Sequence, residues 1–149
     1  MQAENNMHIS FPSYSVNESF ARVVVGAFAA QLNPTLEELA DIKTAVSEAV
    51  TNAIIHAYEG TVGTVEISAA LIGRTLKVEI RDRGKGIEDV EQARQPFYTS
   101  SPGTDRSGMG FTVMETFMDS LEVESALDRG TTVRMEKHIG ADQNGSGEE

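Results

Sequence analysis

The chain has 149 residues, enough for one domain with a normal core, and its 40% hydrophobic and 23% charged residues are typical of a soluble globular protein. It contains no cysteine, which excludes a disulfide scaffold, a thiolate metal site and a cysteine nucleophile. A net charge of −11 argues against nucleic acid or an anionic membrane as a partner, and no apolar run approaches the roughly 18 residues that span a bilayer. Because the first residues also lack a basic and apolar leader, we expect a cytoplasmic protein.

The N-terminal residues predict a strand followed by a helix. In residues 7–14, Pro12 cannot donate a ladder hydrogen bond, so we expect this strand at a sheet edge. Ser15 and Glu18 match the S-x-x-E capping box, in which both side chains bond backbone N–H groups at a helix start. They predict a helix over about residues 16–32.

A second helix is predicted after Asn33-Pro34, which ends the first one. Thr35 and Glu38 form another capping box, and we expect the helix that they open to run to about residue 58. Its apolar residues keep a helical spacing: Leu39, Ile42, Val46, Ala49, Val50, Ala53 and Ala57. One face of this helix should therefore pack in the core.

The remaining elements are predicted as two hairpins separated by a long loop and a helix. Apolar residues alternate on both sides of a Gly73-Arg74 turn, and residues 82–110 are rich in Gly, Pro, Ser and charge, with a short helix over 88–94. An apolar helix should cover residues 110–117, and a closing hairpin should follow at 121–137.

The order of these elements predicts the fold class. Strands that come as hairpins favour a mostly antiparallel sheet with helices on one face, which is an α+β fold built as a two-layer α/β sandwich. We expect a single domain over residues 1–139 and a disordered polar tail over residues 140–149, which have no apolar content.

Basic residues gather in one part of this acidic chain. Such a neighbourhood could hold a compact anion, but the favoured interpretation is that these charges only interact with solvent. Seven of the 12 Lys and Arg residues are involved: Arg74, Lys77, Arg81, Arg83, Lys85, Arg94 and Arg106.

Three polar residues of the second helix, Glu48, Asn52 and His56, are spaced by four and form a stripe beside its apolar face. The amide oxygen of Asn52 suits Mg²⁺, and the carboxylate of Glu48 could orient or deprotonate a hydroxyl or a water. His56 suits a supporting role better than that of a metal ligand. The alternative is that all three are solvated surface residues.

Two glycine-rich segments follow. In the segment from Asp82 to Gly86, a carboxylate at a strand end could accept a hydrogen bond from an exocyclic amine such as that of adenine, although a plain strand-ending turn fits as well. The segment from Ser107 to Phe111 precedes a helix, where exposed N–H groups favour phosphate; a flexible linker is the alternative. The loop at residues 99–106 could close as a lid, with Arg106 reaching a terminal phosphate.

Together these motifs resemble the GHKL (Bergerat) ATP-binding fold: an N box over Glu48 to His56, a G1 box over Asp82 to Gly86 and a G2 box over Gly108 to Gly110. The resemblance implies ATP or ADP and Mg²⁺ as ligands, with Asn52 on the metal. It implies that Asp82 reads adenine and that Glu48 is the catalytic base, assisted by Arg106. The nucleotide-binding residues that it implies are Asn52, His56, Asp82, Gly84, Gly86, Ile87, Ser107, Gly108, Met109, Gly110, Phe111 and Thr132. Gly84 and Gly86 would make room for the base, and Thr132 would contact adenine.

Within that superfamily, SEAVTNAIIHAY, RQPFYTS and RSGMGFTVMETFMDSLEVES are similar to the anti-sigma factor serine kinases of spore-forming bacilli. This resemblance implies a homodimer that binds and inhibits a sporulation sigma factor. It also implies a protein-serine kinase that uses MgATP to phosphorylate an anti-anti-sigma protein. Two alternatives stay open: a nucleotide-dependent sigma-binding module with negligible transfer, and an ATPase whose acceptor is water. Arg22 and the apolar Val23–Val25 are candidates for the partner surface, although the favoured interpretation of Arg22 is a solvated helix residue without a role.

Overall fold

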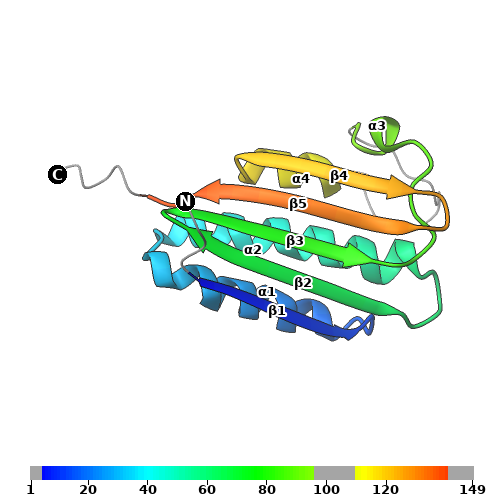
Figure 1. Ribbon diagram of the computed structural model, residues 1–149, viewed down its shortest axis with the longest axis horizontal. Coiled ribbons are helices and arrows are strands. Elements are labelled where there is room, and N and C mark those ends of the chain that lie inside the picture. The colour runs from blue at the N-terminus through cyan, green and yellow to red at the C-terminus, as the bar shows by residue number, and fades with distance from the viewer. Residues whose placement is uncertain (1–4, 96–109, 141–149) are drawn as a thin grey trace.

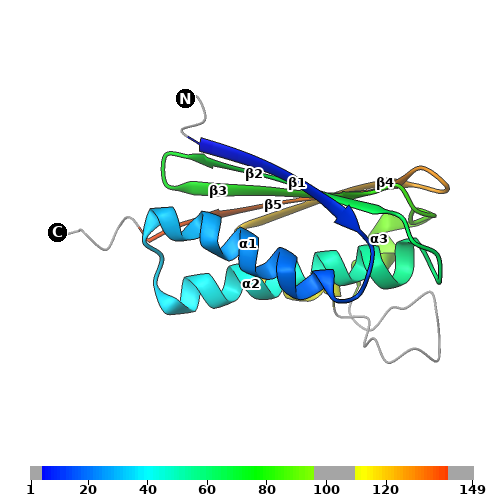
Figure 2. The same ribbon diagram turned by 90° about the horizontal axis from the view of Figure 1, so that it is seen from below.

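The computed structural model describes residues 5–95 and 110–140 of the chain, which form a sheet covered on one face by helices (Figures 1 and 2). The strands are β1 (Asn5–Pro12), β2 (Thr64–Ile72), β3 (Thr75–Asp82), β4 (Ser120–Ala126) and β5 (Gly130–His138). The α-helices are α1 (Asn17–Ala29), α2 (Leu36–Thr51), α3 (Val90–Ala93) and α4 (Gly110–Phe117). A 3₁₀ turn η1 (Ala30–Leu32) extends α1, and a π-helical segment η2 (Asn52–Ala57) extends α2.

The five strands have the order β1-β2-β3-β5-β4, and every neighbouring pair is antiparallel. The predicted α+β class and two-layer architecture are therefore confirmed, and β1 lies at an edge as Pro12 predicted. The turn predicted at Gly73-Arg74 connects β2 to β3.

The core lies between the inner face of the sheet and the helices. Helix α2 lies between α1 and α4 and contacts both (Figure 1). Its Ile42, Val46 and Val50 are completely buried, as predicted from their spacing. The same alternation that buries Val65 and Ile67 in β2 turns the polar residues of the strands outward. None of the helices in the described ranges is long and apolar enough to cross a membrane.

The two predicted capping boxes have different outcomes. The box at Thr35 is confirmed: its hydroxyl accepts from the Glu38 N–H at 3.0 Å, and the Glu38 carboxylate accepts from the Thr35 N–H at 2.9 Å. The box at Ser15 is wrong, because α1 begins without a side-chain cap. The carboxylate of Glu18 instead accepts a hydrogen bond from Ser47 of α2 at 2.5 Å and thereby joins the two helices.

Six of the seven clustered basic residues lie in the described ranges, and each of them contacts a protein group, so the favoured interpretation that these charges only interact with solvent is wrong for them. The guanidinium of Arg74 donates to the carbonyl of Leu32, the last residue of η1, and to that of Ile139, which follows β5. The other pairs are Lys77 with Glu136, Arg81 and Arg83 with Glu66, Lys85 with Glu59, and Arg94 with Glu115. Arg106 lies outside the described residues.

Candidate functional site

The predicted stripe of polar residues lies where the second helix changes its winding. From Asn52 to Ala57 the chain is π-helical, so the expectation of an α-helix to residue 58 is wrong for its last turns. In a π-helix the backbone hydrogen bonds span five residues, which widens the turn, and such segments are frequent at functional sites. Asn52 and His56 both line a cavity despite this change, but they no longer follow the 100° step of an α-helix.

This cavity has a volume of about 770 Å³. It lies between η2, the end of β3, the start of β5, the loop that follows β3, and the start of α4. Its size lies within the range of roughly 300–1,000 Å³ that is usual for small-molecule sites. The lining residues are Ala49, Asn52, His56, Ala57, Ile80, Asp82, Lys85, Gly86, Ile87, Glu88, Asp89, Gln92, Ala93, Gly110, Phe111, Leu127, Thr131 and Val133. The lining thus combines apolar side chains with a few polar groups, as is usual for a site that binds an organic ligand.

Asp82 is the most buried acidic group of this wall, with 7% of its surface exposed. It ends β3, and its carboxylate accepts hydrogen bonds from the backbone N–H of Gly84, at 2.9 Å, and of Thr131. Burial raises the pKa of Asp82 above its ordinary value of 3.8, and the two backbone hydrogen bonds only partly oppose this. A buried carboxylate with two fixed donors keeps further lone pairs, with which it can accept a hydrogen bond from a ligand.

The two glycines after Asp82 pack closely against protein backbone. A Cβ on Gly84 would lie 2.3 Å from the carbonyl oxygen of Ala57, and a Cβ on Gly86, whose φ is +77°, would lie 2.0 Å from that of Ala126. Both glycines therefore make room for protein backbone, and Gly86 also lines the cavity. Their packing brings the loop against η2 on one side and against β4 on the other, which shapes the cavity.

On β5 the cavity is lined by Thr131, and the predicted Thr132 is not part of its wall. Successive strand residues face opposite sides, so a shift of one residue moves a side chain to the outer face of the sheet. The prediction missed Ser125 of β4, whose hydroxyl bonds with that of Thr131 at 2.8 Å and accepts from the Ile87 N–H at 2.7 Å. Ser125 could have been predicted from the alternation of β4, which places it on the same face as the partly buried Leu121 and Val123.

Glu48 and Asn52 come close together at Gly110, the first residue of α4. A Cβ on Gly110 would lie 3.3 Å from Oε1 of Glu48 and 3.4 Å from Nδ2 of Asn52, so a larger residue here would fit only if these side chains shifted slightly. Asn52, Gly110 and Phe111 line the cavity, whereas Glu48 lies beyond it and lines a separate surface groove between α1 and α2. The structure thus brings the N box and the start of α4 together, as expected from the motifs.

Residues 13–137 match the family model of the histidine kinase-like ATPase domain. The chain belongs to this family. It also belongs with the anti-sigma F factors: it is 59% identical over 143 residues to that of Thermoanaerobacter sp. (strain X514), which covers 96% of this chain and all of the relative. The anti-sigma F factors of Caldanaerobacter subterraneus and Clostridium kluyveri (strain ATCC 8527) are 61% and 60% identical, cover 94% and 90% of this chain, and are themselves covered to 98% and 94%. The resemblance drawn from the sequence is confirmed.

Solved structures support the same fold. The crystal structure of the RsbU and RsbW domains of Rv1364c from Mycobacterium tuberculosis has a TM-score of 0.67 at 21% identity, over 91% of this chain and 32% of that one. The mycobacterial sensor histidine kinase MprB has a TM-score of 0.56 at 18% identity, over 89% of this chain and 98% of that one. At these identities the likeness is one of fold alone.

The histidine kinase-like ATPase domain implies a nucleotide, and the cavity is compatible with one. It offers a buried acceptor at Asp82, apolar walls at Ile80 and Val133, and a glycine at the start of α4. For Mg²⁺ the donor set is sparse: the described residues contain no group of three or more His, Asp or Glu that could hold a metal. A single amide oxygen at Asn52 suits an ion that keeps several waters and binds mainly phosphate oxygens.

Four predicted site residues fall outside the described part of the chain. They are Arg106, Ser107, Gly108 and Met109, and the lid expected at residues 99–106 lies there as well. Of the residues on α1 expected to contact a partner protein, Val25 is fully buried, whereas the side chain of Val23 is 57% exposed. Arg22 ion-pairs with Glu18 at 3.6 Å.

Proposed function

We propose that this protein is a cytoplasmic anti-sigma factor and an ATP-dependent protein-serine kinase. It binds a sporulation sigma factor and keeps it inactive, and it phosphorylates a serine of an anti-anti-sigma protein with MgATP. It acts as a homodimer. The names of its relatives and the histidine kinase-like ATPase domain support the anti-sigma and nucleotide-binding parts of this proposal.

In the proposed complex, adenine lies at the sheet end of the cavity. There the Asp82 carboxylate accepts a hydrogen bond from the exocyclic amine, and Thr131 stands beside it. The phosphates extend toward Asn52 and Gly110, where the start of an eight-residue helix favours negative charge. Mg²⁺ held by Asn52 would neutralise part of the phosphate charge there.

One observation carries the kinase part of the proposal: Glu48 stands between the cavity and the surface. Its Oε1 lies close to Gly110 of the cavity wall, and its side chain also lines the groove that opens between α1 and α2. A protein hydroxyl that approaches along this groove can therefore reach the carboxylate without entering the adenine end. An acceptor water would need no such groove.

The transfer then needs little chemistry from the protein. The serine oxygen forms a bond to the γ-phosphorus, and the bond from that phosphorus to the β–γ bridging oxygen breaks, so that ADP leaves. The serine proton passes to the carboxylate of Glu48, which acts as general base. Positioned proton transfer of this kind contributes about 10²–10⁴-fold to a rate.

The test uses the purified protein, Mg²⁺ and γ-labelled ATP, incubated with an extract of sporulating cells. We expect label on a serine of a small second protein, and we expect that protein and a sigma factor to be captured by the tagged chain. Label found only as free phosphate would indicate an ATPase, and label that stays on ATP would indicate a binding module. In both cases the kinase proposal would be wrong.

The Glu48→Gln variant identifies the base. It keeps the size and the polarity of the side chain, so MgATP binding should be unchanged while transfer falls about 10²-fold or more. Glu37→Gln is the matched control, because Glu37 is an exposed glutamate in the first turn of the same helix. Equal transfer by both variants would remove Glu48 from this role.

A further inference from the structure

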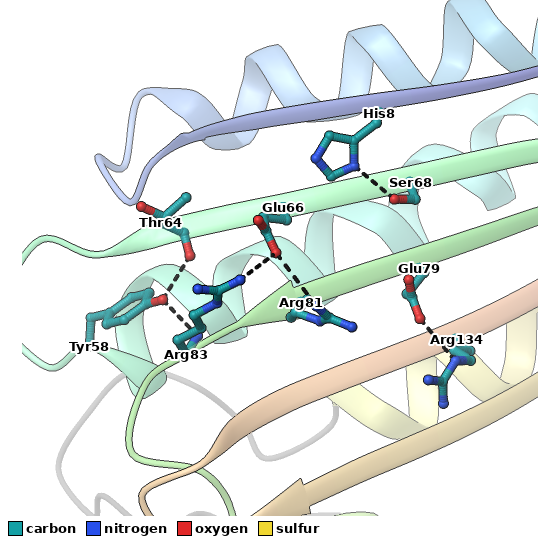
Figure 3. A network of polar contacts seen from close by, with 9 residues as sticks. All are labelled: His8, Tyr58, Thr64, Glu66, Ser68, Glu79, Arg81, Arg83 and Arg134. Atoms are coloured by element: carbon teal, nitrogen blue, oxygen red, sulfur yellow. Dashed lines mark hydrogen bonds and ion pairs between the residues drawn. The ribbon is translucent and has the colours of Figure 1, made fainter.

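The hydroxyl of Tyr58 occupies an unusual place in the sheet. It donates a hydrogen bond to the carbonyl of Thr64 at 2.7 Å and accepts one from the N–H of Arg83 at 2.7 Å (Figure 3). Tyr58 follows directly on η2, whereas Thr64 begins β2 and Arg83 follows the last residue of β3. One phenol group thus joins three segments of the chain.

The register of the sheet explains why this bridge matters. The antiparallel ladder of β2 and β3 ends with the pair Val65 and Asp82, so the next pair along it would be Thr64 and Arg83. In place of direct pairing, the tyrosine oxygen stands between a carbonyl and an N–H of these two residues. The hydroxyl therefore ends the ladder and turns the chain after Asp82 out of the sheet and toward the cavity.

The orientation of Asp82 depends on this turn. Its carboxylate accepts a hydrogen bond from the N–H of Gly84, and that N–H comes one residue after the one that Tyr58 holds. The next N–H, of Lys85, donates to the carbonyl of Ala57 at 2.9 Å. Two successive residues at the end of η2 thus hold the loop at two points, on either side of the donor that orients the carboxylate.

The ring of Tyr58 is itself held in place. A Cβ on Gly63 would lie 2.1 Å from Cε1 of the ring, so the turn before β2 packs closely on the face of the phenol. With its ring fixed, the side chain has little freedom to move its hydroxyl away from Thr64 and Arg83.

We propose that Tyr58 is a positioning residue that sets nucleotide-base specificity: its hydroxyl holds the Arg83–Lys85 loop so that the Asp82 carboxylate faces the adenine amine. This inference rests on the proposed function, in which Asp82 reads adenine. The hydrogen bonds that Tyr58 makes with Thr64 and Arg83 would then serve the selection of the base as well as folding. Tyr58 does not itself touch the nucleotide, because it is not part of the cavity wall.

The test compares ADP with inosine diphosphate, which carries a carbonyl in place of the exocyclic amine. Removing the hydroxyl with Tyr58→Phe leaves the ring packing intact and lets Arg83 pair directly with Thr64, which displaces the N–H of Gly84. We expect the ADP affinity measured by titration calorimetry to fall about 10-fold, the value of one to two hydrogen bonds, and the affinity for inosine diphosphate to change little. The ADP preference should therefore shrink by about the same factor.

The control is Tyr14→Phe, which removes the hydroxyl of a 54% exposed tyrosine and should leave the preference unchanged. An equal loss for both nucleotides in Tyr58→Phe would indicate a purely structural role and would overturn the inference, as would no loss at all. A wild-type protein that binds both nucleotides equally would instead refute the assignment of Asp82, which separates the two failures.

A measurement on the unmutated protein keeps the inference testable even where Tyr58→Phe does not fold. Amide hydrogen exchange in the absence of nucleotide should show protection at Arg83, although this residue lies beyond the end of β3. Exchange at the rate of an open loop would show that the tyrosine does not hold this backbone in solution, and the inference would fall.

Discussion

The substitution Gly84→Ala tests the contact that shapes the cavity. The Cβ of the alanine would lie 2.3 Å from the carbonyl oxygen of Ala57, whereas carbon and oxygen atoms in ordinary contact are about 3.3 Å apart. The loop must therefore withdraw from η2 by about 1 Å. Because the φ angle of Gly84 is not positive, alanine can adopt the backbone conformation, and the collision is the only cause of strain.

The expected loss of stability follows from the hydrogen bonds that this movement stretches. They run from the Lys85 N–H to Ala57, at 2.9 Å, and from the Arg83 N–H to the Tyr58 hydroxyl, at 2.7 Å. A withdrawal of about 1 Å takes both beyond hydrogen-bonding range, at about 1 kcal/mol each. With about 1–3 kcal/mol for overpacking, the free energy of unfolding should fall by about 3–5 kcal/mol.

Urea unfolding monitored by circular dichroism measures this loss, and the matched control is Gly60→Ala. Gly60 has a φ of +84° and no atom within 4 Å of its Cβ position, so this variant carries only the conformational cost, about 1–2 kcal/mol. Gly84→Ala should lose clearly more than that, and its ADP affinity should also fall, because the Gly84 N–H orients Asp82. If Gly84→Ala is no less stable than Gly60→Ala, the close packing of the loop on η2 is refuted.

Three further predictions concern Asp82 and the caps. Asp82→Asn can present a donor to the adenine amine, so calorimetry should show ADP binding at least about 10-fold weaker; unchanged affinity would sink the assignment. Burial raises the pKa of Asp82 above 3.8, so between pH 3.8 and the pKa of the folded state the native protein keeps a proton that the unfolded chain has released. The free energy of unfolding of the wild type, measured by urea titration relative to that of Asp82→Asn, should therefore fall as the pH rises from 3.8 to the pKa of the folded state. A difference that does not change with pH would contradict this. Thr35→Ala should lose about 1 kcal/mol in urea unfolding and Ser15→Ala about 0.5 kcal/mol or less, and equal losses would refute the cap assignment.

The sequence indicated which motifs belong to the candidate site, but it did not indicate every side chain that lines the cavity. Glu48, Asn52 and Asp82 belong to motifs whose order along the chain resembles a nucleotide site, and the structure places Asn52 and Asp82 on the wall of one cavity and Glu48 beside Gly110 of that wall. The sequence did not indicate which of two adjacent threonines faces the ligand. Thr131 and Thr132 have the same chemistry, and the phase of β5 is decided by how the strand pairs with β3.

The helix caps show the same division. Ser15 and Thr35 have equivalent local sequences, each followed three residues later by glutamate. Only Thr35 forms the box, because Glu18 has a partner from a distant part of the chain in Ser47 of the neighbouring helix. A capping motif shows which hydrogen bonds a side chain can make with the nearby backbone. Tertiary packing decides whether the glutamate of the motif accepts a hydrogen bond from a more distant donor instead.

The sequence by itself determined the elements, their order and therefore the α+β architecture, because helical spacing, strand alternation and turn residues are properties of neighbouring positions. Tertiary structure alone decided the π-helical winding of η2, the close seat of Gly84 on Ala57 and the bridge that Tyr58 makes between β2 and β3. These features depend on atoms that are distant in the chain and meet only when helix and sheet pack. The packing of the helices on the sheet selects the π-helical winding of η2 and the path of the loop after β3, and no local sequence pattern contains this packing energy.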